Sequence, residues 1–458
     1  MRTGLSYGTS FLGITFGAAC TLAACFGPPF TLRAPAAESG EGGTGGQGGG
    51  DAGGGQAGGG AGGRDGGGDD RTTLVVQDKA GVPVSGIMVV VNDETGAVVV
   101  LTETGGDGRA EVTIPLAGSV SVFSTVEAAL HVHTVVDPPP GLTIPVIVDR
   151  PAGALPEKTL YQGIVVGEPP GTDRVHIWST CDTASSDMIL DNEKCRDAVT
   201  IDFLGVAFDA DDNAIAWGLT PNQPTSPGGG AIFIPLDVTE TTFHTLDAAI
   251  TGALPATSYA GVTLGFDLTV EDMITLPSPI APPPLAVTLR APAVPGMGYR
   301  IHEFAWSWSD AASPISRIER ERHYAVLPAS TTFAVNSMAP LSVNPLDLLD
   351  PVHPELTWSV AGGERGDQGT LGLSWGSGIV TVTYEAVFAP DHTTSFRVPE
   401  IPPELSSYAP SATTTFGTSI SVWYDDLESA DGYGDVLDGV PPIDGLGQVR
   451  SGAYLTQP

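Results

Sequence analysis

The sequence predicts an all-β protein, made of tandem antiparallel β-sandwiches that follow a disordered glycine-rich tether. From residue 71 onward, short β-branched runs recur and are separated by Gly or Asp-Gly turns. No stretch of 12 or more residues in this part keeps a helical period without Pro or Gly. By contrast, residues 40–68 hold 19 of the 60 glycines and almost no side chain that could form a core.

The charge of the chain excludes two classes of function. The formal charge is −34, and residues 71–458 alone carry 47 acidic and 16 basic residues. A nucleic-acid binder that neutralises phosphates needs a basic face, and so does a protein held electrostatically on a membrane surface. Hydrophobic residues make up 41% of the chain, which argues against disorder throughout.

The first 24 residues predict a secretory signal that ends in Leu22-Ala23-Ala24-Cys25. This tetrapeptide resembles the lipobox of bacterial lipoproteins, which implies cleavage before Cys25 and acylation of its thiol. Cys20 is a poorer second candidate, because it lacks the large apolar residue three positions earlier. Phe26 stands where an Asp would imply retention in the inner membrane. The resemblance therefore implies a lipid-anchored protein of the outer membrane or cell surface.

Composition divides the rest of the chain into a tether and three predicted sandwiches. Residues 25–71 form the lipidated N-terminus and linker, and proline-rich seams separate sandwiches at 72–150, 157–290 and 296–458. A single larger β domain in place of the last two stays open as an alternative.

The first predicted sandwich has a recurring arrangement of turns. Residues 76–86 read V-Q-D-K-A-G-V-P-V-S-G, and residues 104–108 read T-G-G-D-G. This arrangement resembles the carboxypeptidase regulatory-like (transthyretin-like) sandwich, and the overall expectation is an Ig-like or transthyretin-like fold. Such modules are spacers or binding units, and no His here is followed by Glu three residues on, as in the zinc peptidases that they accompany. Asp107-Gly108 predicts a hairpin between residues 98–102 and 110–114.

Two cysteines remain after the signal and the lipid are assigned. Because an exported protein with two remaining cysteines usually joins them, we expect a disulfide between Cys181 and Cys195. Closing a loop of about 15 residues stabilises by roughly 3 kcal/mol in the chain-entropy model.

Three short motifs match known functional signatures, but the residues around each one do not support that function. Gly372-Leu-Ser374-Trp-Gly376 matches a nucleophile elbow, but a turn and a strand follow instead of a helix. His131-Val-His133 would place two imidazoles on one strand face without an identifiable third metal ligand. Arg365-Gly-Asp367 spells an integrin-type tripeptide, which we interpret as coincidence. The sequence therefore predicts no enzyme.

One predicted strand has a wholly aromatic face, formed by Phe304, Trp306 and Trp308. Two interpretations are open: the rings pack in a core, or Trp306 and Trp308 form a platform on which a sugar stacks.

The acidic C-terminal segment suggests a calcium site. The run D-G-Y-G-D-V-L-D at 431–438 resembles the end of a thrombospondin type 3 calcium loop, although the earlier Asp positions of that family fall on Leu427 and Ser429. The alternative is a solvated acidic tail. The loop at 209–213 is a weaker calcium candidate, and the strand-like residues on both sides of it favour a hairpin turn. The candidate calcium ligands are Asp431, Asp435 and Asp438, with Asp425 and Asp426 as substitutes.

These observations predict a lipid-anchored surface or periplasm-facing protein with a structural, adhesive or ligand-binding role. The alternative is a hydrolase of secreted polymers or its carbohydrate-binding accessory subunit. We expect no cofactor other than calcium, attachment to a membrane through the lipid, an extracellular glycan or protein ligand, and no nucleic-acid partner.

Overall fold

A computed structural model describes most of the chain from residue 70 onward. The described residues are 70–78, 81–126, 129–148, 160–179, 183–185, 189–191, 200–224, 230–236, 243–252, 258–266, 280–307, 315–335, 341–360, 365–377, 380–390, 393–417, 419–439 and 447–456. The predicted signal, Cys25, the tether, the Cys181–Cys195 disulfide and Trp308 all lie outside them.

The prediction of an all-β fold is confirmed. The described residues form strands in several sheets. They also include a 3₁₀ helix, η3 (Pro403–Tyr408), and a short α-helix, α2 (Tyr433–Asp438). Neither helix is long and apolar enough to span a membrane.

The first module contains seven strands in two sheets. In one sheet the order is β4-β1-β7, with β1 and β7 parallel, and in the other it is β3-β2-β5-β6. The strands are β1 (Arg71–Gln77), β2 (Met88–Asn92), β3 (Val98–Glu103), β4 (Arg109–Thr113), β5 (Ser119–Val126), β6 (Ala129–Val136) and β7 (Thr143–Ile147).

The predicted hairpin at Asp107-Gly108 is wrong, because the turn carries the chain from one sheet to the other. β3 pairs with β2, whereas β4 pairs with β1. Gly108 has a φ of 72°, and a Cβ there would lie 2.4 Å from the carbonyl oxygen of Val76. The turn therefore packs tightly against the end of β1, which only glycine allows.

The second module repeats this topology strand for strand. Its sheets are β11-β8-β14, with β8 and β14 parallel, and β10-β9-β12-β13. The predicted hairpin at residues 209–213 is confirmed, since it connects β12 and β13. The strands are β8 (Leu160–Val166), β9 (Arg174–Ser179), β10 (Thr183–Ser185), β11 (Ile189–Asp191), β12 (Thr200–Phe208), β13 (Ala214–Pro224) and β14 (Gly230–Pro235).

The third module has the same topology again. Its sheets are β18-β15-β21, with β15 and β21 parallel, and β17-β16-β19-β20. Its strand pairs cross the predicted boundary at 290–296, because β16 pairs with β19 and β15 with β21. The strands are β15 (Phe243–Thr251), β16 (Ser258–Phe266), β17 (Ile280–Ala281), β18 (Leu285–Pro292), β19 (Tyr299–Ser307), β20 (Ile315–Tyr324) and β21 (Ser330–Ala334).

The remaining strands form a fourth unit with a different order. One sheet is β22-β23-β26, and four strands in the order β25-β24-β28-β29 belong to the other. Buried aromatic rings fill its core, among them Trp358 and Phe388 with centroids 5.2 Å apart. The strands are β22 (Leu341–Val343), β23 (Glu355–Val360), β24 (Gln368–Ser377), β25 (Val380–Phe388), β26 (Ser395–Arg397), β27 (Thr415–Phe416), β28 (Ser419–Leu427) and β29 (Gly447–Thr456).

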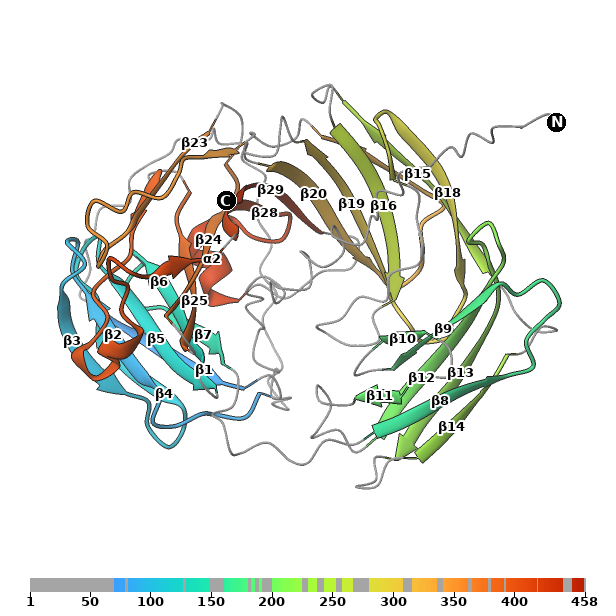
Figure 1. The fold of residues 1–458 in the computed structure, drawn as a ribbon, viewed down its shortest axis with the longest axis horizontal. Coiled ribbons are helices and arrows are strands. Elements are labelled where there is room, and N and C mark those ends of the chain that lie inside the picture. The colour runs from blue at the N-terminus through green and yellow to red at the C-terminus, as the bar shows by residue number, and fades with distance from the viewer. Residues whose placement is uncertain are drawn as a thin grey trace, which may run out of the picture. The chain divides into compact units, whose positions relative to one another are not determined.

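The fourth unit is joined to two modules by strand pairing. β29 pairs antiparallel with β20 of the third module, and β25 pairs parallel with β6 of the first. One sheet therefore runs from β17 through the fourth unit to β3 (Figure 1). Figure 1 shows these segments by colour: blue to teal for the first module, green for the second, yellow-green to golden brown for the third, and orange to red for the fourth unit.

Candidate functional site

A row of charged side chains crosses the junction between the third module and the fourth unit. The strand register places Glu319 of β20 opposite Arg450 of β29, and Arg450 opposite Asp425 of β28. Gln368 of β24 follows opposite Asp425. Because residues directly opposite each other share a face of the sheet, these four side chains form one polar row.

The polar row is closely bonded and buried. Arg450 donates to both carboxylate oxygens of Asp425, and Gln368 Nε2 donates to Asp425 Oδ2 over 3.1 Å. At the other end, Glu319 Oε2 lies 3.1 Å from His302 Nε2 and 2.5 Å from Arg317 Nε. Glu319, Asp425 and Arg450 are all buried. Each buried charge thus faces an opposite charge, as burial requires.

The cations around Glu319 determine its protonation. Burial alone would raise the pKa of its carboxyl, but Arg317, His302 and Arg450 together lower that pKa below its usual range. Glu319 is therefore ionised at neutral pH, forms ion pairs with Arg317 and Arg450, and shares a hydrogen bond with His302.

An aromatic platform lies on the same face of the sheet. We use this name for Tyr259 of β16 and for Phe304 and Trp306 of β19. Tyr259 stands directly opposite Trp306, with ring centroids 6.2 Å apart. The intervening Ala305 is buried, whereas Phe304 and Trp306 are half-buried and Tyr259 is 36% exposed. The aromatic face predicted from the sequence therefore turns away from the core of the third module, and Trp308 lies outside the described residues.

The opposite, inward face of the same strands carries a buried ion pair. Arg320 Nε donates to Glu303 Oε2 over 2.6 Å, and Thr331 Oγ1 donates to Glu303 Oε1 over 3.0 Å. Arg320 also donates to the carbonyl oxygen of Thr332 over 2.8 Å and lies over the Phe333 ring. Burial raises the pKa of Glu303, although Arg320 opposes that shift. Sequence reasoning missed this pair, whose only signal is the alternation of Arg and Glu along β20.

The calcium candidates occupy two different environments. Asp425 is fully buried against Arg450, whereas Asp431, Asp435 and Asp438 are exposed around α2. Asp435 Oδ2 accepts a hydrogen bond from the backbone N–H of Asp431 over 3.0 Å. Among the described residues, no three His, Cys, Asp or Glu side chains are grouped so as to hold a metal ion. Calcium binding by Asp426 and the exposed aspartates stays a prediction.

The same acidic segment has a structural contact that the sequence did not reveal. The Tyr433 hydroxyl lies 3.0 Å from the carbonyl oxygens of both Val136 and Val387. These residues belong to β6 and to β25, so α2 is anchored where the first module meets the fourth unit.

Ser374 is not placed as a nucleophile. It lies within β24, which pairs with β25 along its whole length, and its backbone oxygen accepts a hydrogen bond from Gly417. The next described element after β24 is the strand β25, as expected from the sequence, and not the helix that a nucleophile elbow requires.

The His-x-His and Arg-Gly-Asp motifs are both part of the sheet and its turns. His131 and His133 share one face of β6, and His133 Nδ1 lies 3.5 Å from Glu385 Oε2. Asp367 Oδ2 accepts the backbone N–H of Leu427 over 2.9 Å, and Gly366 has a φ of 75°. The Arg-Gly-Asp turn is thus packed against β28.

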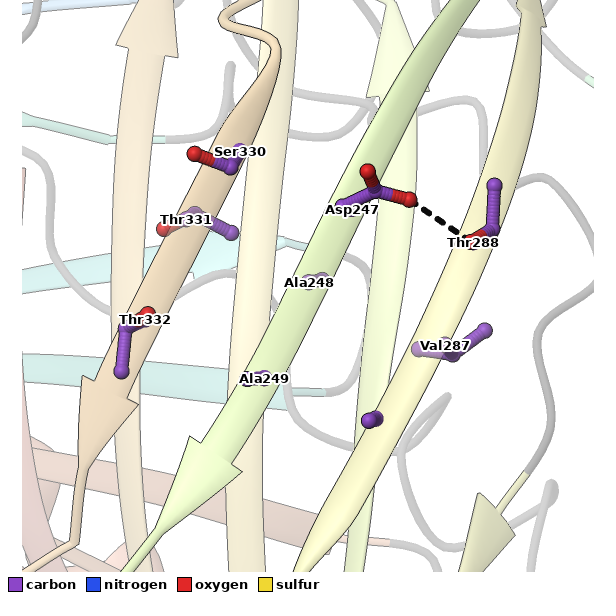
Figure 2. A pocket seen from close by; sticks show the side chains of 9 residues that line it. Asp247, Ala248, Ala249, Val287, Thr288, Ser330, Thr331 and Thr332 are labelled. Atoms are coloured by element: carbon purple, nitrogen blue, oxygen red, sulfur yellow. Dashed lines mark hydrogen bonds between the residues drawn. The ribbon is translucent and has the colours of Figure 1, made fainter.

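An open depression lies over β15, β18 and β21 of the third module (Figure 2). Small side chains line it, and the carboxylate of Asp247 accepts a hydrogen bond from Thr288 over 2.7 Å. Among the described residues that line it, Asp247 is the only titratable one.

No model of a known protein family matches the chain, and no curated protein is significantly similar to it. Among solved structures, it is similar to the Bacillus anthracis TIE protein over 58% of this chain and 49% of that chain, with 10% identity and a TM-score of 0.15. It is also similar to the shaft pilin spaA from Lactobacillus rhamnosus GG over 58% and 96% of the two chains, with 8% identity and a TM-score of 0.12.

A third similarity is to the FN1–FN3 domains of chicken CNTN1, over 63% and 90% of the two chains, with 10% identity and a TM-score of 0.14. The chain spans about half the length of the TIE protein.

Proposed function

We propose that this protein is an exported, lipid-anchored β-sandwich protein with an adhesive or ligand-binding role outside the cytoplasm and no catalytic activity. The observation that carries the proposal is the aromatic platform, because Phe304 and Trp306 turn away from the core and lie beside the exposed Tyr259. Aromatic side chains outside a core supply large contact area to a ligand. The lipobox-like run that ends at Cys25 supports the anchor.

The second candidate is a carbohydrate-binding accessory subunit of a hydrolase that acts on secreted polymers. The aromatic platform also favours this role, since an accessory subunit needs a binding face and no catalytic group of its own.

Two measurements on the full-length protein test the proposal. Metabolic labelling with palmitate should label the wild-type chain and fail to label Cys25→Ser, while Cys20→Ser should be labelled as wild type. The full-length protein, purified in detergent, should bind intact cells or their extracellular polymers. A Cys25→Ser chain that is still labelled, or a full chain that binds no cell-surface material, would contradict the proposal.

A further inference from the structure

The strand β3 forms an open end of the long sheet. This sheet runs from β17 to β3, and among the described strands β3 pairs with β2 alone (Figure 1). The Thr104 N–H donates to the Ile87 carbonyl oxygen, which fixes the backbone groups that face β2. Because these directions alternate along a strand, the N–H and C=O groups of Leu101 and Glu103 point to the open side. Within the described part of the chain, that side of β3 therefore presents backbone donors and acceptors to solvent.

The middle of β3 is apolar and exposed. Val99, Val100 and Leu101 are 48%, 38% and 45% exposed. These residues are consecutive, so their side chains lie on both faces of the sheet. Natural edge strands resist pairing with other chains when they are very short or carry Lys or Pro. β3 contains neither Lys nor Pro, so nothing in its composition blocks the addition of another strand.

The equivalent strands of the other two modules are shorter. β10 and β17 end the corresponding sheets of the second and third modules. As described, they contain three and two residues, whereas β3 contains six. Since the three modules share one topology, the long apolar edge is a property of the β3 sequence and not of the fold.

Both ends of β3 are acidic. Residues 93–108, which comprise β3 and the turns on either side of it, contain four acidic residues and no basic residue. Glu94, Glu103 and Asp107 of this set are exposed. A second copy of the chain would bring the same acidic turns and a formal charge of −34, so its approach is opposed by repulsion. A cationic partner is attracted to the same edge.

We propose that β3 is a docking site for an extended segment of a basic polypeptide, which adds to the sheet as a further strand. Its backbone bonds to the open groups of Leu101 and Glu103, and its apolar side chains pack beside Val99 and Leu101. Lys or Arg residues at its ends lie near Glu94 and Glu103. The inference goes beyond the proposed function, because it uses neither the lipid anchor nor the aromatic platform.

The test measures binding of a peptide library to the full-length protein in detergent. Each peptide has six central positions drawn from Val, Ile, Thr and Tyr, with two lysines at each end, and the control library has glutamates in place of the lysines. Fluorescence anisotropy should show binding of lysine-flanked peptides that is tighter than that of their glutamate-flanked counterparts and weakens as salt is added. The bound peptide should also slow hydrogen exchange within residues 98–103.

Two substitutions of Leu101 test the strand addition itself. Leu101→Pro removes an open N–H without removing a hydrogen bond to β2, and proline is tolerated on the open side of an edge strand. It should weaken peptide binding by about tenfold or more. Leu101→Lys keeps the backbone and adds the charge with which natural edge strands resist pairing, so it should also weaken binding. Melting temperatures equal to that of wild type would exclude a folding defect.

A matched pair of charge reversals tests the role of the acidic ends. Glu103→Lys should weaken binding of the lysine-flanked peptides by about fivefold, because an attraction becomes a repulsion. Glu168→Lys is the control, since Glu168 is exposed in the second module and the substitution changes the net charge of the chain equally. It should leave the affinity unchanged.

Four results would overturn the proposal. The first is that no lysine-flanked peptide binds more tightly than its glutamate-flanked counterpart. The second is equal losses for Glu103→Lys and Glu168→Lys, and the third is binding that leaves hydrogen exchange within residues 98–103 unchanged. The fourth is a dimer of the protein alone that Leu101→Pro dissociates, because a second copy would then occupy the edge.

Discussion

The first and third modules share one topology but place different chemistry at equivalent strands. In the first module the directly opposite residues Val120 of β5 and Val135 of β6 are both buried and apolar. In the third module the equivalent strands β19 and β20 carry the buried pair Glu303 and Arg320 on one face. The other face of β19 and β20 holds the aromatic platform and Glu319.

This difference shows which features determine the topology. Both modules pair a four-stranded sheet with a three-stranded sheet, in which the first and last strands of the module are parallel neighbours. The ion pair substitutes for apolar residues only because Thr331 and the backbone of Thr332 satisfy its remaining polar atoms. A sandwich of this order therefore accepts a buried charge where the opposite sheet supplies its partners.

The largest expected effect comes from breaking the inward ion pair. Arg320→Ala leaves the Glu303 carboxylate buried without its cation, and removal of one partner from such a pair costs about 3–5 kcal/mol. Hydrogen exchange should show faster exchange in β19 and β20, while β5 and β6 of the first module keep their protection.

A double variant separates the charge from the shape of the site. Glu303→Leu combined with Arg320→Met replaces the pair with apolar side chains, and it should recover most of the lost stability. If the double variant exchanges as fast as Arg320→Ala, the buried charge is not the cause of the loss.

A smaller effect is expected on the outward face, and it depends on pH. The pKa of Glu319 in the folded protein lies below its unfolded value, so its stabilisation is complete above that unfolded value and is lost as the pH falls below it. Glu319→Gln should melt at a lower temperature than wild type at pH 7. The difference should shrink as the pH is lowered below about 4.5, the ordinary pKa of a glutamate.

Glu303 is expected to contribute to stability with the opposite pH dependence from Glu319. Its pKa is raised, so the Glu303 side chain stabilises the fold most as the neutral carboxyl, below its unfolded pKa, and that contribution is lost as the pH rises through its folded pKa. The comparison of Glu319→Gln with wild type cancels this contribution, since both chains contain Glu303. A melting difference that stays constant between pH 7 and pH 3 would contradict the role given to Glu319.

The smallest effect is expected where the first module meets the fourth unit. The Tyr384 hydroxyl lies 2.6 Å from Thr134 Oγ1, which in turn lies 2.8 Å from Ser121 Oγ. Tyr384→Phe removes one buried hydrogen bond between β25 and β6, at a cost of about 1 kcal/mol, and thermal unfolding should detect it.

The matched control for the junction lies inside the fourth unit. Tyr424 is equally buried, and its hydroxyl accepts from Trp358 Nε1 and donates to the Thr393 carbonyl oxygen. Tyr424→Phe should cost more than Tyr384→Phe, because it leaves the indole N–H without this acceptor. The reverse order would mean that the junction hydrogen bond matters more than we infer.

The sequence predicted the strands and the sandwich class, because β-branched runs and glycine turns are local signals. It did not predict that three modules share one order of strands, since the pairing partners are distant in the sequence. The Asp107-Gly108 error has the same origin. A turn signal reports that the chain reverses, but not whether the next strand pairs with the previous one.

The site was predictable in part for a similar reason. Alternation along β19 predicted a single aromatic face, but which side of the sheet turns inward depends on other strands, such as β21, whose Thr331 bonds to Glu303. The acidic run near Asp425 suggested calcium, because nothing close to it in the sequence marks Arg450 as its partner.

The pairing of β29 between β20 and β28 has a consequence for the order of synthesis. β20 ends at Tyr324, and its neighbour begins only at Gly447. Likewise, β6 ends at Val136, while its neighbour β25 begins at Val380. An emerging chain therefore carries β6 as an open sheet edge while residues 137–379 are made, and β20 while residues 325–446 are made. Open edges pair readily with other chains, so this stage of synthesis is where the protein most needs a chaperone.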